Sequence, residues 1–313
     1  MRPTPWFRVA VTAPLLTLAA ACGGGGGGGS GITSPPSADW YVSATTGSDV
    51  AAGTAGSPFR TLTHALSVAS SGEIVFAFPG LYDAANGETF PLLVPAGVTL
   101  LGDEPSKGGG FLATAIVGSG LAPSPNPGGS LGATIVPGTG STLAGFWIRN
   151  DAPPSAVAAE AVLLPAAAVT VRNNRILDSE DGVVCYNAVG DHVIVGNVIE
   201  GHRTSGIVYD GGGEGSLVES NRITRNLYGA EFRSTGGDMG GGGAGSVGLN
   251  VLSCNTGADL WTDVSSLTTL AACFNVWDHV APSETPGPGV DVSNANGAAV
   301  LVVGATLHVA GCH

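Results

Sequence analysis

The chain has 313 residues, of which 51 are glycine and 20 are proline, and only 11% are charged. This composition suits a turn-rich, all-β protein of one large solenoid domain, or two ordinary domains, better than a helical protein. The net charge of −13 argues against a nucleic-acid-binding protein, which needs a basic surface. It also argues against direct contact with an anionic polymer unless a cation bridges the two.

The amino terminus has the pattern of a targeting segment. Arg2 and Arg8 give it positive charge, and residues 9–21 form an apolar run that is too short to span a bilayer. We predict a signal peptide at residues 1–21 and a Gly/Ser-rich tether at residues 22–38. Removal of residues 1–21 takes away two of the 11 basic residues and no acid, so the charge becomes −13 − 2 = −15.

The run LAAAC, which ends at Cys22, resembles the cleavage site of bacterial lipoproteins. It departs from that pattern at Ala19, where the family usually has leucine. The resemblance implies that Cys22 is lipidated and becomes the first residue of the mature protein. We therefore expect an exported protein that is lipid-anchored to the bacterial envelope, at the outer membrane or the cell surface. Ordinary secretion, with cleavage nearby, is the alternative.

The first part of the domain at residues 39–313 predicts strands and one helix. An apolar side recurs along Pro58–Ser70, so this segment reads as a helix suited to cover the first coil of a solenoid. Strands are expected at Trp40–Ser43, Glu73–Phe78, Leu92–Val94 and Val98–Leu101.

Residues 169–263 contain a repeat that is marked by asparagines. They are Asn174, Asn197, Asn221 and Asn250, and a fifth copy follows at Asn275, with spacings of 23, 24, 29 and 25 residues. A glycine follows each of the first four, at Gly182, Gly206, Gly229 and Gly257. A fixed period of this length is typical of stacked repeats. The 29-residue step from Gly145 to Asn174 also predicts an extra loop at about Pro153–Ala167.

Each repeat holds short β-branched runs, and no window has a sustained helical period. About 24 residues at roughly 3.3 Å each can coil once as three short strands, and stacked coils form a parallel β-helix. Asn174, Asn197, Asn221 and Asn250 would then form a hydrogen-bonded ladder at one bend. Ordinary asparagine-rich turns are the alternative.

Two resemblances agree with this architecture. The order YVS…GSD…GT…SPFRTLTHAL within residues 39–135 resembles an uncharacterised domain at the head of bacterial surface β-helix proteins. The Asn/Gly coils at residues 140–300 resemble the repeats of the pectate-lyase-like superfamily. The resemblance implies a single-stranded, right-handed parallel β-helix with an N-terminal capping helix. It implies no activity, because this fold carries lyases, hydrolases, adhesins and scaffolds.

Alternation after the marker glycines predicts two faces. The inward positions are apolar and include Cys185, a candidate for a small core residue. The outward positions form a candidate glycan-binding face and a set of carboxylates suited to catalysis or to Ca²⁺. The glycan-binding candidates are Tyr186, Asp210, Arg233 and Trp261, and the carboxylates are Glu231, Asp259 and Asp291. A merely solvated sheet face is the alternative.

The remaining cysteines and histidines give fewer indications of a functional site. Cys254 and Cys273 are 19 residues apart on neighbouring coils, which favours a disulfide between them. The run NVWDHV resembles the Trp-Ile-Asp-His run of pectate lyases but lacks one residue, so we infer no lyase activity from it. Trp277 is instead expected in the core. His192 and His202 show no zinc spacing.

Three functions remain open on this sequence. We favour a non-catalytic carbohydrate-binding or structural surface module. The alternatives are a polysaccharide lyase or glycoside hydrolase that acts through the outward carboxylates, and an adhesin that contacts other proteins. We predict a monomer with no cofactor except, at the carboxylates, Ca²⁺. The predicted partners are the membrane, through Cys22, and a polysaccharide.

Overall fold

The computed structural model describes residues 35–123, 130–153, 159–186, 190–211, 213, 215–233, 237–263, 269–284, 290–297 and 299–308. The chain divides into two units, Met1–Pro35 and Pro36–His313, and only the second is described below. The predicted signal peptide, Cys22 and most of the tether lie outside the described residues. Within the described part of the chain, no helix is long and apolar enough to span a membrane.

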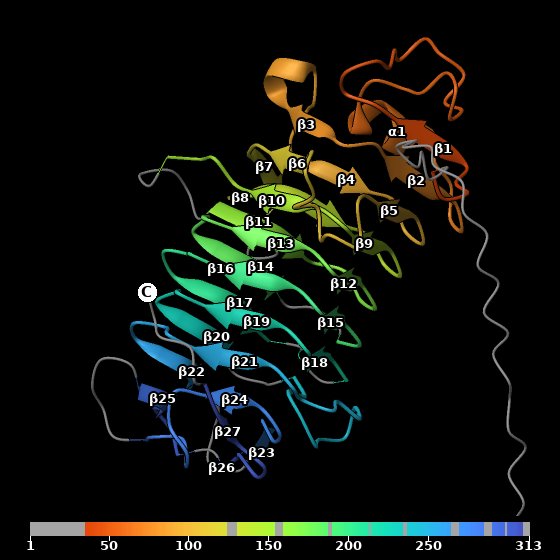
Figure 1. The fold of residues 1–313 in the computed structure, drawn as a ribbon. Coiled ribbons are helices and arrows are strands. Elements are labelled where there is room, and N and C mark those ends of the chain that lie inside the picture. Colours follow the sequence, from red (N-terminus) through yellow and green to blue (C-terminus); the bar gives the residue numbers. More distant parts are fainter. Residues whose placement is uncertain are drawn as a thin grey trace, which may run out of the picture. The chain divides into compact units, whose positions relative to one another are not determined.

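The second unit is a right-handed parallel β-helix, as predicted, in which successive coils add strands to three parallel sheets (Figure 1). Sheet 1 contains β1 (Trp40–Val42), β2 (Ile74–Ala77), β5 (Thr99–Leu101), β9 (Thr142–Ala144), β12 (Thr170–Arg172), β15 (Val193–Val195) and β18 (Leu217–Glu219). Sheet 2 contains β3 (Gly80–Asp83), β6 (Thr114–Val117), β10 (Trp147–Arg149), β13 (Arg175–Leu177), β16 (Val198–Glu200), β19 (Arg222–Thr224), β21 (Val251–Ser253), β24 (Val276–Trp277) and β27 (Thr306–Leu307).

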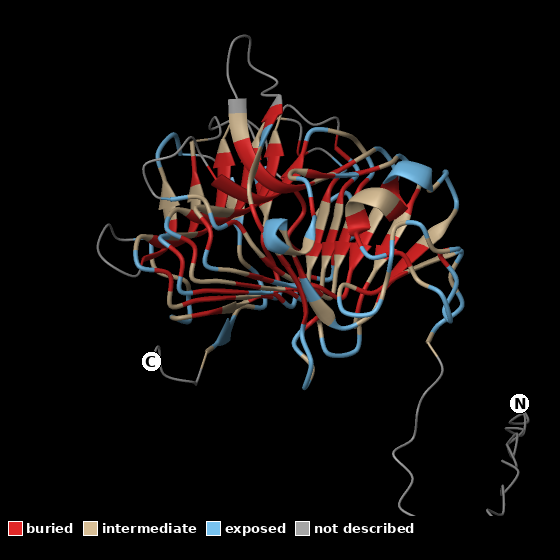
Figure 2. Ribbon diagram, turned by 90° about the horizontal axis from the view of Figure 1, so that it is seen from above, coloured by how far each residue is buried: buried red, intermediate tan, exposed pale blue. Residues whose placement is uncertain are grey.

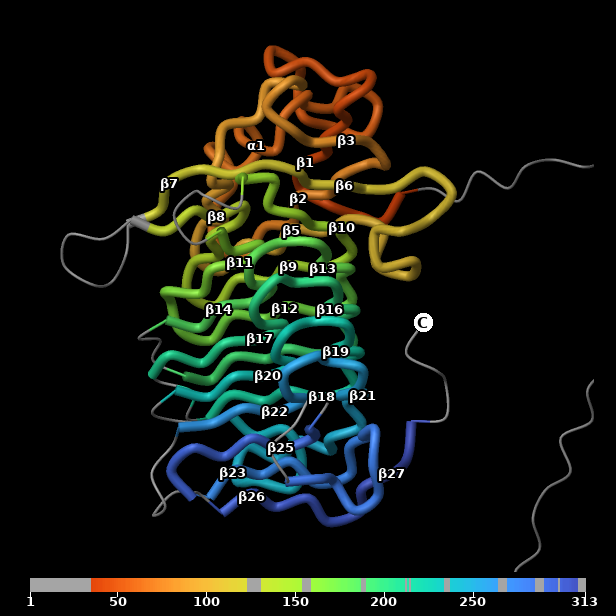
Figure 3. The backbone as a smooth tube through the Cα atoms, turned by 90° about the vertical axis from the view of Figure 1, so that its left-hand side faces the viewer, coloured from red at the N-terminus to blue at the C-terminus, as the bar shows by residue number. Residues whose placement is uncertain are grey.

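Sheet 3 carries the candidate face. It contains β4 (Leu92–Val94), β8 (Ser130–Pro137), β11 (Ala159–Leu164), β14 (Asp181–Tyr186), β17 (Ser205–Asp210), β20 (Tyr228–Arg233), β22 (Ala258–Thr262) and β25 (Val290–Asn294). β7 (Gly120–Pro123) pairs antiparallel with β8. A separate pair joins β23 (Thr269–Ala271) to β26 (Ala299–Leu301). The stacking of the coils is clearest in Figure 3.

The core is a column of aliphatic side chains inside the coils, which Figure 2 shows as buried segments facing one another. Alternation along each short strand leaves its middle residue pointing inward. In sheet 2 these residues are Ile148, Ile176, Ile199, Ile223 and Leu252, all fully buried, and Trp277 follows them. The prediction that Trp277 is a core residue is therefore confirmed.

The marker asparagines form a buried ladder between sheets 1 and 2. The Nδ2 atom of Asn174 donates to Oδ1 of Asn197 at 3.1 Å, and the same bond repeats at 3.0 Å to Asn221, Asn250 and Asn275 in turn. Each asparagine follows a residue with positive φ, among them Asn173, Gly196, Ser220, Leu249 and Phe274. This left-handed residue turns the chain sharply, and the asparagine amide then satisfies backbone groups that the bend leaves unpaired.

The capping helix is shorter than the sequence predicts. Helix α1 spans Leu62–Val68, because Phe59 instead pairs with the β1 strand through backbone hydrogen bonds to Tyr41 and Ser43. Thr61 caps the helix, and the buried carboxylate of Glu88 accepts hydrogen bonds from the first backbone amides. A carboxylate is favourable there because it meets the positive end of the helix dipole.

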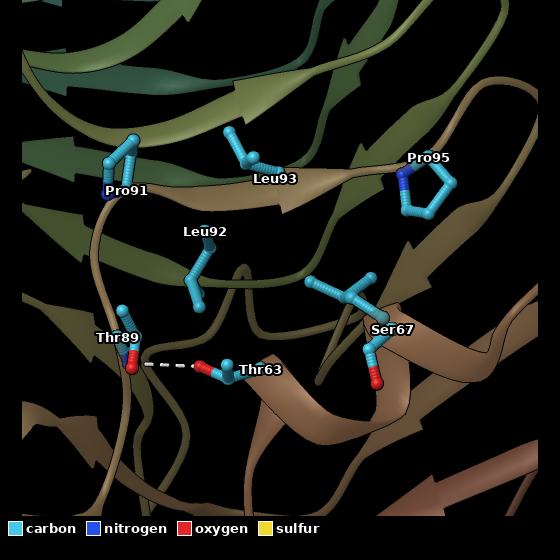
Figure 4. Close-up of a pocket in the computed structure, with 8 residues that line it drawn as sticks. Thr63, Ser67, Thr89, Pro91, Leu92, Leu93 and Pro95 are labelled. Atoms are coloured by element: carbon cyan, nitrogen blue, oxygen red, sulfur yellow. Dashed lines mark hydrogen bonds between the residues drawn. The ribbon is translucent and has the colours of Figure 1, made fainter.

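A pocket of about 380 Å³ lies between α1 and the segment that leads into β4 (Figure 4). Its lining is mostly apolar and includes Leu66, Leu92, Pro91 and Pro95, with one hydrogen bond from Thr89 N to Thr63 Oγ1 at its edge. No charged side chain lines it, so the pocket offers packing surface without a group that would orient a polar ligand.

The prediction of a loop at Pro153–Ala167 is wrong for most of the described residues in this range. β11 occupies Ala159–Leu164, and all six of its residues are buried.

Candidate functional site

The outer face of sheet 3 is set by a bend at the marker glycines. Gly182, Gly206 and Gly229 face inward, since a Cβ on Gly229 would lie 2.7 Å from the Asn255 side-chain nitrogen inside the coil. Because the chain bends at these glycines, regular alternation does not continue through them. The residues just before the glycines, and the second and fourth residues after them, point outward.

The outward positions Val184 and Val208 of the first coils are apolar and buried, so this part of the face is not the solvated surface of the alternative interpretation. Val184 and Val208 are 4% and 2% exposed and pack with Leu163, Ala122 and Ala133. Ala122 belongs to β7, which pairs with β8, so the apolar cluster continues to this edge of the sheet. The half-buried Tyr186 packs against the edge of the same cluster.

A group of charged side chains continues the face. Glu231 accepts hydrogen bonds from Arg233 Nε at 2.7 Å and from Ser205 Oγ at 2.6 Å. Arg233 also lies 3.8 Å from Asp210, and the predicted row of Tyr186, Asp210 and Arg233 is in register across three strands. Asp210 and Arg233 are half-buried, so this ion pair can meet a ligand from solvent.

A carboxyl pair that sequence analysis missed lies on the same face. Glu160 and Asp181 are adjacent in register on β11 and β14. Burial and the Asp181 carboxylate raise the pKa of Glu160. The pair could have been found only by recognising β11 as a strand.

An aromatic pair lies two strands further along. Tyr228 and Trp261 have ring centroids 6.2 Å apart, and both are half-buried. The predicted alignment of Gly257 with Gly229 is wrong by two residues, because Ala258 pairs with Tyr228. Trp261 therefore lies opposite Glu231 rather than Arg233, although it keeps its outward direction.

The same correction moves two predicted carboxylates off this face. Asp259 takes the position of the inward-facing Gly229, and Asp291 takes the equivalent position on the next strand. They are 1% and 0% exposed and lie beside Asp278. Glu231 therefore does not stack with Asp259 and Asp291, and it contacts residues of the outer face instead.

The predicted Cys254–Cys273 disulfide is wrong. Cys273 is a free, buried thiol, whereas Cys254 is disulfide-bonded and so has another partner. Spacing on neighbouring coils was a poor guide because the Cys273 sulfur turns toward the carbonyl of Leu301, at 3.5 Å. Cys185 is a fully buried free thiol of the core, as predicted.

His192 and His202 are structural. Both are buried, and burial lowers the pKa of each to about 4. Their rings accept from the backbone amides of Val169 and Ser179 on the preceding coils. His202 belongs to a second internal ladder, since its own amide donates to Asn226, whose side chain donates to Asn255.

The fold is a right-handed parallel β-helix. The chain belongs to the family described as "Protein of unknown function (DUF1565)", whose model matches residues 45–284. This confirms the predicted membership of an uncharacterised β-helix family. No curated protein matches the sequence.

Solved structures share the fold at low sequence identity. The complex of XylC with xylose has a TM-score of 0.53 and 13% identity, over 86% of this chain and 68% of that one. The pectin methylesterase PemA from Erwinia chrysanthemi has a TM-score of 0.41 and 15% identity, over 82% and 75% of the two chains. A rhamnogalacturonan lyase has a TM-score of 0.39 and 13% identity, over 86% of each chain.

Proposed function

We propose that this protein is a non-catalytic carbohydrate-binding module of the bacterial envelope, which holds a glycan on the outer face of sheet 3. The observation that carries the proposal is the Tyr228–Trp261 pair beside the Glu231–Arg233–Asp210 group. Aromatic rings offer flat apolar area to a sugar ring. Carboxylates and a guanidinium form strong hydrogen bonds with hydroxyl groups.

The XylC structure supports a carbohydrate-related role, because a protein of the same fold is described there in complex with xylose. At 13% identity, this similarity supports a common fold but not a common ligand. The proposal of glycan binding therefore depends on the residues of the outer face. In its support, the charged group keeps hydrogen-bonding capacity. Asp210 is half-buried and lies at the longer distance of 3.8 Å from Arg233, so a ligand hydroxyl group can bridge the two from the solvent side.

The test is a glycan array run with and without Ca²⁺, followed by affinity measurements with Trp261→Ala. We expect the variant to weaken binding by roughly 1–3 kcal/mol, or about 5- to 150-fold in Kd, with little change in melting temperature. Trp147→Ala is the matched control, because Trp147 is a half-buried tryptophan on sheet 2 and should leave binding intact.

A lower melting temperature for Trp261→Ala with unchanged glycan affinity would show that the ring is packing and that the proposal is wrong. An array without hits, together with binding to surface proteins, would favour the adhesin.

A second candidate, a glycoside hydrolase or polysaccharide lyase, is favoured by the Glu160–Asp181 pair. Two carboxyl groups with different proton affinity are what acid–base cleavage of a glycosidic bond needs. Glu160 is only 3% exposed, which is why we rank binding first. Any glycan that binds should be assayed for new reducing ends or unsaturated products, and Glu160→Gln should abolish them if this candidate is right.

We further propose that the domain is exported and attached to the envelope through a lipid on Cys22. The charged start, the short apolar run and the glycine tether of the sequence support this location. We also propose that the protein acts as a monomer.

A further inference from the structure

Three carboxyl groups gather inside the last coils. One oxygen from each of Asp259, Asp278 and Asp291 lies within 4.8 Å of the other two. Asp259 is on β22, Asp278 directly follows β24, and Asp291 is on β25, so three separate segments converge on one point.

The fold aims Asp259 into this point. Asp259 stands where the preceding coil has Gly229, and a side chain at that position enters the interior next to the Asn255 amide. The Oδ1 atom of Asp259 accepts a hydrogen bond of 2.8 Å from this amide. The second internal ladder, which passes from Asn226 to Asn255, thus ends on a carboxyl group instead of another amide.

The other two carboxylates are held in place by hydrogen bonds. Asp291 accepts from the backbone amides of Asp278, His279 and Ser283, and from the Ser283 hydroxyl, while His279 Nδ1 lies 2.8 Å from its Oδ2. Asp278 Oδ2 accepts from the amide of Cys254 at 2.7 Å. The positions of the carboxylates are therefore fixed before any ligand arrives, which lowers the cost of binding.

One carboxylate oxygen of Asp259 takes part in none of these hydrogen bonds. Its Oδ2 is buried and has no hydrogen-bond partner among the described residues, although the side chain is 1% exposed. Buried polar atoms normally have a partner, so an orphaned carboxylate oxygen calls for one.

We propose that Asp259, Asp278 and Asp291 bind one Ca²⁺ ion, with the free Oδ2 of Asp259 as a ligand. The three donors are all carboxylate oxygen atoms, which are the ligands that Ca²⁺ prefers. Two ligands of one Ca²⁺ can be up to about 5 Å apart, whereas the shorter bonds of Mg²⁺ allow only about 4.2 Å. Oxygen atoms that all lie within 4.8 Å of one another can therefore share one Ca²⁺ ion.

Two other interpretations are distinguishable. Cys254, Asp278 and His308 also lie within 4.8 Å of one another, but Cys254 is disulfide-bonded and has no thiolate to offer a soft metal. Alternatively, Asp259 carries a proton, because burial together with the Asp278 and Asp291 carboxylates raises the pKa of Asp259 to about 8. The calcium proposal is independent of glycan binding, because this cluster lies inside the coil and not on the outer face.

The experiment uses the purified full chain after treatment with a chelator. Calorimetric titration with CaCl₂ should give one bound ion per chain, and MgCl₂ should bind more weakly. Tb³⁺ bound at the same place should luminesce on tryptophan excitation, because Trp277 is the neighbour of Asp278, and Ca²⁺ should displace it. Asp259→Asn should weaken Ca²⁺ binding by about tenfold or more, since even loss of a residue that only supports a metal ligand costs about that much.

Asp191→Asn is the matched control, because Asp191 is exposed, lies on another coil and has a positive φ that asparagine tolerates. Absence of any Tb³⁺ emission that Ca²⁺ displaces would overturn the proposal on the wild-type protein alone, even if Asp259→Asn fails to fold. Wild-type Ca²⁺ affinity in a folded Asp259→Asn variant would overturn it as well. No Ca²⁺ binding together with a stable Asp259→Asn variant would identify Asp259 as a protonated acid.

Discussion

Asn221 shows how one side chain can stabilise three coils. Its amide nitrogen donates to Ile194 O and to Asn250 Oδ1, and its oxygen accepts from the backbone and side-chain nitrogens of Asn197. All these groups are buried, so removal of the amide leaves several of them without a partner.

We expect Asn221→Ala to lower the free energy of unfolding by about 3 kcal/mol, the scale of one to three buried groups left unpaired. Urea denaturation monitored by circular dichroism would measure it. Asn296→Ala is the control, since Asn296 is exposed and outside the ladder, and it should change stability by less than about 0.5 kcal/mol. Equal losses for both variants would mean that the ladder contributes nothing special.

Glu160 gives the outer face a pH dependence with a definite sign. Burial and the Asp181 carboxylate raise the pKa of Glu160 from 4.5 to about 9. Between these two pKa values, Glu160 keeps its proton in the folded protein but has released it in the unfolded chain. The contribution to stability is therefore complete below pH 4.5 and is lost as the pH rises toward 9, by up to about 1.4 kcal/mol per pH unit.

Glu160→Gln should remove this loss, because the neutral amide has no proton to release. We expect the variant to gain stability relative to wild type as the pH is raised from 6 to 8, in urea titrations at each pH. The buried histidines titrate identically in both proteins, so their effect cancels in the difference. Parallel curves for the two proteins, or the same gain from the exposed Glu284→Gln, would contradict the assignment.

At the scale of elements, periodicity predicted the coils but not every strand. The regular apolar middle positions and the asparagine bends are local patterns, so the architecture and the ladder could be read from the sequence. β11 was not predicted because its sequence, AEAVLL, has no asparagine or glycine marker and few β-branched residues. All six of its residues are buried, and this burial depends on tertiary contacts that no local pattern shows.

The candidate site was harder to predict because it depends on register. The glycine-rich insertion after β20 breaks the count of residues, and Asp238 in it bridges to Leu217 at the end of sheet 1. The next strand of sheet 3 then pairs two residues away from the marker alignment. A two-residue shift preserves which face a side chain takes in a regular strand, so Trp261 stayed outward. At the bend beside Gly229 this alternation fails, so Asp259 turned inward.

At the scale of the whole molecule, charge is distributed unevenly along the solenoid. The eleven basic residues all precede Asp238, whereas six acidic residues follow Arg233. An acidic far end is disfavoured against an anionic membrane surface, so electrostatics alone would not hold this protein at the envelope. A covalent anchor ahead of the domain would do so, and the predicted tether at residues 22–38 would give about 20–25 Å of flexible reach.

Cys22→Ser is therefore the decisive test of attachment to the envelope. We expect the wild-type protein to fractionate with membranes and to enter the detergent phase on Triton X-114 partition, because lipid chains bury many methylene groups. Cys22→Ser should appear in the aqueous phase. Cys273→Ser is the matched control, because Cys273 is a free thiol in the folded domain and serine can still donate to Leu301 O. Membrane association that persists in Cys22→Ser would mean that the domain is held by its own surface.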